Sequence, residues 1–155
     1  MLPTTKMVDA IYALALVHLT PAPMTPGAQT ESTDYFTRHN LTVNQQRDGT
    51  GYALSALTAG QKKDLVLSNR LRTMPGRVAI YGWHRTNGKP IQPLSTVHGQ
   101  GYADYSHGIR LISATAFVNG KPRALADILQ DPGISAAVSS EGPITLSNQL
   151  LASLQ

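Results

Sequence analysis

Proline and glycine interrupt this chain so often that only short helices and strands have room to form. Residues 20–30 hold three prolines and a glycine, a composition in which no regular element persists, so we expect a linker or an extended arm there. Turn signals of the same kind recur along the chain at 48–51, 74–76, 87–88, 119–122 and 131–133. Helices and strands must therefore fit between these breaks.

The first intervals predict helices. Thr4 or Thr5 can cap a first helix. One face of that helix would carry Met7, Ala10, Ile11, Leu14 and His18 at helical spacing. A second helix is expected to follow Ser32 or Thr33 and to run to about residue 47, where the turn signal ends it.

The middle of the chain predicts strands at 61–68, 77–84 and 109–118, and a short helix at 123–129 follows. Pro90 and Pro93 interrupt the run after the Asn87–Gly88 turn, so we expect an edge strand or a loop there. This order is typical of an α+β fold. We predict one small domain (1–155) with N-terminal helices and a mainly antiparallel central sheet, in which 1–31 is a helix or arm plus linker and 145–155 is prone to fraying.

Composition excludes several classes of site. The chain has no cysteine, so a thiol nucleophile, an iron–sulfur cluster, a thiolate zinc site and disulfides are ruled out. Thirteen Lys and Arg against nine Asp and Glu give a net charge of only +4, and the basic residues are scattered, so nucleic acid is an unlikely partner. Nothing in the sequence indicates the oligomeric state.

The N-terminus bears on export. Residues 10–19 have the length of a signal-peptide core, but one Lys6 together with Asp9 makes a poor basic region, and the prolines after it make a poor cleavage context. We therefore expect a helix rather than a signal peptide, and an exported or periplasmic location stays open. No stretch is long and apolar enough for a transmembrane helix, so no membrane span is expected.

Polar chemistry is concentrated between residues 81 and 110. This window contains three of the five histidines, and its glycines would let the backbone approach a ligand closely. It leads directly into the predicted strand 109–118, and loops at strand ends are where sites usually form. The candidate site residues are Tyr81, Trp83, His84, His98, Tyr102, Asp104, Tyr105, Ser106, His107 and Arg110.

A metal-dependent hydrolase is the leading hypothesis. His98, Asp104 and His107 supply two imidazoles and a carboxylate, a ligand set that suits zinc or another divalent metal with one open position. His84 or Tyr102 would then transfer protons, and Arg110 would hold an anionic group of the substrate. Trp83, Tyr105 and Lys63 are expected to contact the substrate, a peptide or glycan such as one from the cell wall.

The same residues allow a metal-free route. His107 would act as a base oriented by Asp104, and Ser106 or a water molecule would attack. Neighbouring residues in an extended chain point apart, so His98 rather than His107 would be the partner of Ser106. A purely structural role is also open, in which Asp104 caps backbone amides of a turn and Arg110 forms an ordinary salt bridge.

The alternative from another class is a non-catalytic module that binds sugar or peptide. In that hypothesis the histidines are structural, and four aromatic rings form an exposed binding surface. The rings are Tyr81, Trp83, Tyr102 and Tyr105.

Two family motifs resemble parts of this window. His98, Gly101 and Ala103 resemble the Ser-x-His-x-x-Gly-x-Ala-x-Asp motif of the zinc D-Ala-D-Ala peptidases, although Asp104 comes one residue early and Ser95 one residue too far before His98. The run His98–Gly99 followed by 106–111 resembles the L,D-transpeptidase signature, except that its nucleophilic cysteine is missing. The first resemblance implies a zinc site, and the second a binding function or a serine variant.

A third resemblance spans more of the chain. It rests on the segments 62–64 (Lys-Lys-Asp), 78–84, 88–94 and 104–111, which are similar to a group of uncharacterised bacterial proteins. In that group a histidine often precedes the Lys-Lys-Asp sequence, whereas this chain has Gln61 there. If that histidine is a base or a ligand, the replacement implies an inactive member.

Overall fold

The computed structural model describes residues 1–145. It begins with helix α1 (Thr5–Leu14), which starts where predicted because the Thr4 hydroxyl accepts a hydrogen bond from the backbone N–H of Met7. The helix ends at Leu14, so His18 is not on its apolar face as expected. His18 lies instead in the two-residue strand β1 (Val17–His18), because the chain turns extended at Ala15.

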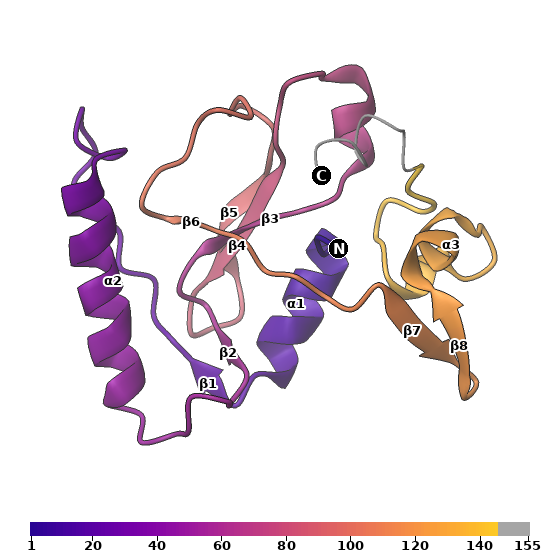
Figure 1. Cartoon of the computed structure of the whole chain (residues 1–155), viewed down its shortest axis with the longest axis horizontal. Coiled ribbons are helices and arrows are strands. Elements are labelled where there is room, and N and C mark those ends of the chain that lie inside the picture. Colours follow the sequence, from indigo (N-terminus) through magenta and orange to yellow (C-terminus); the bar gives the residue numbers. More distant parts are fainter. Residues whose placement is uncertain (146–155) are drawn as a thin grey trace.

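Helix α2 (Thr33–Asp48) follows the proline-rich segment and confirms the second predicted helix, with Ser32 as its N-cap. It is a polar helix, and His39 is its one buried residue. Figure 1 shows α2 standing along one side of the central strands. After α2, strand β2 (Thr58–Ala59) pairs in parallel with β1.

The central sheet has four strands in the order β5-β4-β3-β6. They are β3 (Lys63–Leu65), β4 (Ile80–His84), β5 (Pro90–Ser95) and β6 (His107–Gly108). The β3–β4 and β4–β5 pairs are antiparallel and β3–β6 is parallel, which confirms an α+β fold with a mainly antiparallel sheet. The proline-containing strand β5 lies at an edge, as predicted, because proline cannot donate to a ladder on both sides.

The C-terminal part forms a second packed region. Strands β7 (Thr115–Val118) and β8 (Lys121–Ala124) form a hairpin that leads into helix α3 (Leu125–Gln130). Figure 1 shows this unit on the side of the sheet away from α2. Short 3-10 helices lie at Asn69–Thr73 and Ser135–Ala137. The main core cluster joins this part to the segment after β3 and consists of Leu67, Leu125, Ile128, Leu129 and Ile144.

The predicted strand 109–118 is wrong in its first half. Strand β6 ends at Gly108, and β7 begins only at Thr115. Between them Ile109 and Leu111 are more than 70% exposed, whereas Arg110 turns inward to an ion pair with Asp64. The alternation of side chains that indicated a strand is therefore present, but its apolar side faces solvent rather than a core.

Two other expectations concern the ends of the chain and the membrane. The predicted fraying of 145–155 falls, apart from residue 145, outside the described residues. No helix within residues 1–145 is both long and apolar enough to cross a membrane.

Candidate functional site

Strand β4 ends in an unusual backbone conformation that places two predicted site residues. Gly82 has φ of +108° and Trp83 has φ of +56°, and the pairing with β5 shifts register between Ile80 and Gly82. A bulky residue with positive φ is strained by about 1–3 kcal/mol and persists only where its surroundings enforce it. As a result Trp83 contacts Tyr105, whereas its neighbour His84 contacts helix α1.

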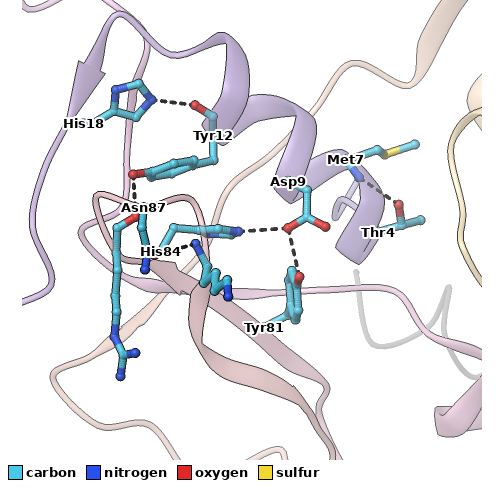
Figure 2. Close-up of polar contacts among 10 residues, drawn as sticks. Thr4, Met7, Asp9, Tyr12, His18, Tyr81, His84 and Asn87 are labelled. Carbon is cyan, nitrogen blue, oxygen red and sulfur yellow. Dashed lines mark hydrogen bonds and ion pairs between the residues drawn. The ribbon is translucent and has the colours of Figure 1, made fainter.

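His84 belongs to a cluster that includes helix α1. Its Nε2 atom lies 2.9 Å from Oδ1 of Asp9, which also accepts a 2.9 Å hydrogen bond from the Tyr81 hydroxyl (Figure 2). The imidazole stacks on Tyr12 with ring centres 4.6 Å apart and is only 3% exposed. Burial and the hydrogen bond to the charged Asp9 raise the pKa of Tyr81 to about 12. These contacts fasten α1 to the sheet.

The structure thus divides the predicted site in two. Among the described residues, no ring contact links His84 with His98 or His107. His98, Tyr102 and His107 do come together: His98 stacks on Tyr102 with ring centres 4.3 Å apart, and the His98 and His107 centres are 5.2 Å apart. With Asp104, these side chains form what we call the His–Tyr group.

Asp104 is the anchor of the His–Tyr group. Its Oδ1 atom accepts hydrogen bonds from the backbone N–H of Ser106 at 2.8 Å and from the Ser106 hydroxyl at 2.5 Å. Its Oδ2 atom accepts a 3.3 Å hydrogen bond from the Tyr102 hydroxyl and lies 3.9 Å from Nε2 of His107. Burial acts to raise the pKa of Asp104, but the Ser106 hydrogen bonds, His107 and Lys63 outweigh it and lower that pKa.

Ser106 is engaged rather than free. Its hydroxyl donates to Asp104, and the residue is only 1% exposed. This geometry corresponds to the turn-capping role that the sequence left open for Asp104, and it leaves the serine hydroxyl no path to a substrate.

His107 is held neutral by its surroundings. Burial lowers its pKa, and Lys63, His98 and Lys62 lower it further against the opposing effect of Asp104. Its buried Nε2 atom has no hydrogen-bond partner among the described residues. A neutral imidazole can accept a proton at neutral pH, so His107 has the protonation state of a general base.

Two lysines lie beside this group. Lys63 lies opposite His107 in the β3–β6 pairing, and its Nζ atom is 5.3 Å from the centre of the Trp83 ring. Lys62 donates from Nζ to the Tyr105 carbonyl at 2.5 Å. Burial lowers the pKa of Lys62, with Asp104 acting in the opposite direction. A partly exposed cation–π contact contributes about 0.5–1 kcal/mol, less than the strain at Trp83.

Trp83 and Tyr105 are buried, being 4% and 6% exposed. The Tyr105 hydroxyl accepts a hydrogen bond from the Met24 N–H and donates one to the Met24 carbonyl, so it fastens the proline-rich segment to the sheet. Two of the four rings of the predicted aromatic surface therefore lie inside the protein, which leaves Tyr81 and Tyr102 as its accessible members.

His39 is a residue of this region that the sequence interpretation missed. It is fully buried in α2, and its ring packs against Trp83 and Tyr105. Burial and Lys62 lower its pKa to about 4, with the Ala22 carbonyl and Asp104 acting in the opposite direction. The one available signal was the i, i+4 spacing of Tyr35 and His39, which both contact Tyr105.

Arg110, the predicted anchor for an anionic substrate group, contacts two groups of the protein itself. Its Nε lies 3.7 Å from Oδ1 of Asp64, and its Nη2 donates to the Thr58 carbonyl at 3.0 Å. This is the salt bridge that the sequence left open as the structural role. Burial raises the pKa of Asp64, while Arg110 and then His84 act against that rise.

The metal hypothesis remains a prediction. Two nitrogen or oxygen ligands of one tetrahedral zinc lie roughly 3.3–3.5 Å apart, whereas the His107 and Asp104 atoms are 3.9 Å apart. Within residues 1–145, no group of three or more His, Asp or Glu side chains is arranged to hold a metal ion. Binding a metal would therefore require these side chains to move closer together.

Comparisons with known proteins give no relative whose function could be considered for this site. The chain matches no protein-family model, no curated protein and no solved structure.

Proposed function

We propose that this protein is a small hydrolase that acts on a peptide or glycan through the His–Tyr group. The observation that carries the proposal is that the rings of His98, Tyr102 and His107 pack together beside Asp104, and that His107 is kept neutral there. A neutral histidine next to a carboxylate is the arrangement that general-base catalysis requires.

In the proposed reaction the attacking group is water, because the Ser106 hydroxyl is buried and donates to Asp104. On a peptide, His107 takes a proton from the water at Nδ1, because its Nε2 atom is buried and faces Asp104. The water oxygen bonds to the carbonyl carbon as this proton leaves, and Asp104 stabilises the imidazolium that forms. The carbon–nitrogen bond of the tetrahedral intermediate then breaks, and the proton passes from His107 to the leaving amine. Tyr102, which donates to Asp104, positions that carboxylate.

The metal-dependent variant uses the same residues. If zinc or another divalent metal binds, His98, Asp104 and His107 are the side chains that would hold it, and the metal would supply an activated water. Elemental analysis of protein purified without chelators distinguishes the variants. About one metal per chain, lost in His98→Ala, supports the metal route, and no metal after incubation with zinc supports the metal-free route.

Hydrolysis is tested with a panel of N-acetylated glycan oligomers and short peptides, with product release measured by mass spectrometry. We expect turnover by the wild-type chain and loss of at least 100-fold in His107→Gln, because a general base contributes roughly 10²–10⁴-fold. The control is His18→Gln, an exposed histidine outside the group that should keep full activity. Equal activity in His107→Gln, or no turnover of either class by the wild type, would overturn the proposal.

A further inference from the structure

Lys63 is placed beside the proposed base by the sheet itself. Its backbone N–H donates to the Ser106 carbonyl at 2.8 Å, and in the parallel β3–β6 pairing it lies opposite His107. Gly108 makes this approach possible, since a Cβ there would come within 2.9 Å of the Lys62 Cβ. The close pairing of β3 with β6 therefore fixes where the Lys63 side chain begins.

Lys63 lies close to carboxylates without forming an ion pair in the part of the chain that the structure describes. Asp104, which Lys63 affects electrostatically, already accepts three hydrogen bonds from Ser106 and Tyr102, and Asp64 is paired with Arg110. Lys62 is a second positive charge that acts on His107. Two cations thus stand against one carboxylate around His107.

The conformation of Trp83 is a separate observation that points to a ligand near Lys63. Its strained backbone holds the indole beneath Lys63, although the cation–π contact alone is weaker than that strain. Its buried Nε1 donor also has no partner in the described part of the chain. Strained residues cluster where a ligand is clamped, so this conformation points to a bound group near Lys63.

We propose that Lys63 binds an oxyanion of the substrate, a carboxylate or a phosphate, directly beside His107. The proposal rests on the proposed function in that it names the substrate class of the same site: molecules that carry an anionic group close to the bond that is cleaved. A lysine ammonium suits this role because it is a compact point charge that donates to carboxylate and phosphate oxygens alike. Arg110, to which the sequence assigned this task, is occupied by Asp64.

The test uses the protein's single tryptophan as a reporter, because Trp83 lies under the proposed site. Inorganic phosphate and acetate are titrated separately into the full-length chain, with sodium chloride added to keep ionic strength constant, and tryptophan fluorescence is recorded. We expect a saturable change for at least one anion. Saturation by phosphate alone identifies a phosphate-bearing substrate, by acetate alone a carboxylate, and by both an oxyanion site of either kind.

Variants separate binding from general charge effects. Lys63→Gln should weaken the response at least tenfold, Lys63→Arg should retain it, and Lys89→Gln, at an exposed position in the β4–β5 turn, should leave it unchanged. A wild-type response no larger than that to chloride, or an equal response in Lys63→Gln, would overturn the proposal.

A second readout guards against a misfolded variant. Anion binding beside His107 should raise the pKa of that imidazole. This pKa is measured in the wild-type chain by NMR of the His107 ring protons. No change in that titration on adding either anion would also overturn the proposal. Because neither measurement needs turnover, anion binding without hydrolysis would defeat only the proposed function, and hydrolysis without anion binding would defeat only this inference.

Discussion

Asp104 should be the residue on which the geometry of the site most depends. Replacing it with alanine removes the acceptor for both the backbone N–H and the hydroxyl of the buried Ser106. A buried donor left without a partner costs about 1–3 kcal/mol. The hydroxyl can rotate toward another acceptor and the N–H cannot, so we expect Asp104→Ala to lower the free energy of unfolding by about 2–4 kcal/mol.

Two matched variants separate the reasons for that loss. Asp104→Asn keeps an oxygen that can accept from Ser106, and Ser106→Ala removes only the hydroxyl, so each should cost about 1 kcal/mol. The assay is urea unfolding followed by Trp83 fluorescence, with the midpoint and the slope fitted separately. Asp104→Ala within about 0.5 kcal/mol of the wild type, a typical surface effect, would refute the reasoning. Equal losses in Asp104→Asn and Asp104→Ala would show that charge rather than acceptor geometry holds the turn.

The same carboxylate makes a pH prediction with a defined sign. The folded-state pKa of Asp104 is lower than its unfolded value, so its contribution to stability is complete above the unfolded pKa, about 3.9. It is lost as pH falls below that value and through the folded pKa. The difference in stability between the wild type and Asp104→Asn should therefore shrink in acid. A difference that grows instead would contradict the assigned direction.

Three further predictions concern the fold around the site. Gly60→Ala should lower the free energy of unfolding in urea by more than about 2 kcal/mol, because φ is +99° there and a Cβ would overlap the Leu19 carbonyl oxygen. Gly88→Ala, at φ +78° in open space, should lower it clearly less. Equal losses in the two variants would refute the steric argument. Asp9→Ala should lower the free energy of unfolding by about 1–3 kcal/mol, because it leaves the buried His84 Nε2 without an acceptor, and Asp9→Asn should lower it by less than half as much. Wild-type stability of Asp9→Ala would show that the Asp9–His84 contact does not stabilise the fold. His39 has a folded pKa of about 4 against about 6.5 when unfolded, so the unfolded chain binds more protons and stability should fall as pH drops from about 6.5 to 4. In His39→Leu that part of the pH dependence should disappear, and an unchanged acid profile would contradict the assignment.

The helices were predicted correctly because their signals lie within a few residues of each helix start. Thr4 and Ser32 mark both long helices, because an N-cap acts on amides within the next turn and so is visible in the sequence. The strand expected at 109–118 failed because alternation does not show whether an apolar side chain such as Ile109 has anything to pack against.

The contacts of the site residues were likewise predictable where they are local in sequence and not where they are distant. His98, Tyr102, Asp104 and His107 lie within ten residues of one another, so a short turn brings them together and the sequence window contained them all. The partner of His84 is Asp9, 75 residues away, and nothing local indicates that pair. His39 reaches Trp83 only through the packing of α2, which depends on the whole fold.

The parallel pairing of β1 with β2 has a consequence for how this chain tolerates change in length. Because Val17 pairs with Thr58, everything between them, α2 included, is one long loop that is closed by a two-residue ladder and held at Met24 and Thr30 by Tyr105. Loop-closure entropy grows only with the logarithm of length, so cutting this loop from about 40 to about 10 residues would lower its cost by roughly 1.2 kcal/mol. A helix that buries a single side chain, His39, returns little packing in exchange. What α2 contributes to the sheet is the packing of His39 against Trp83 and Tyr105, so a shortened loop would uncover these two rings.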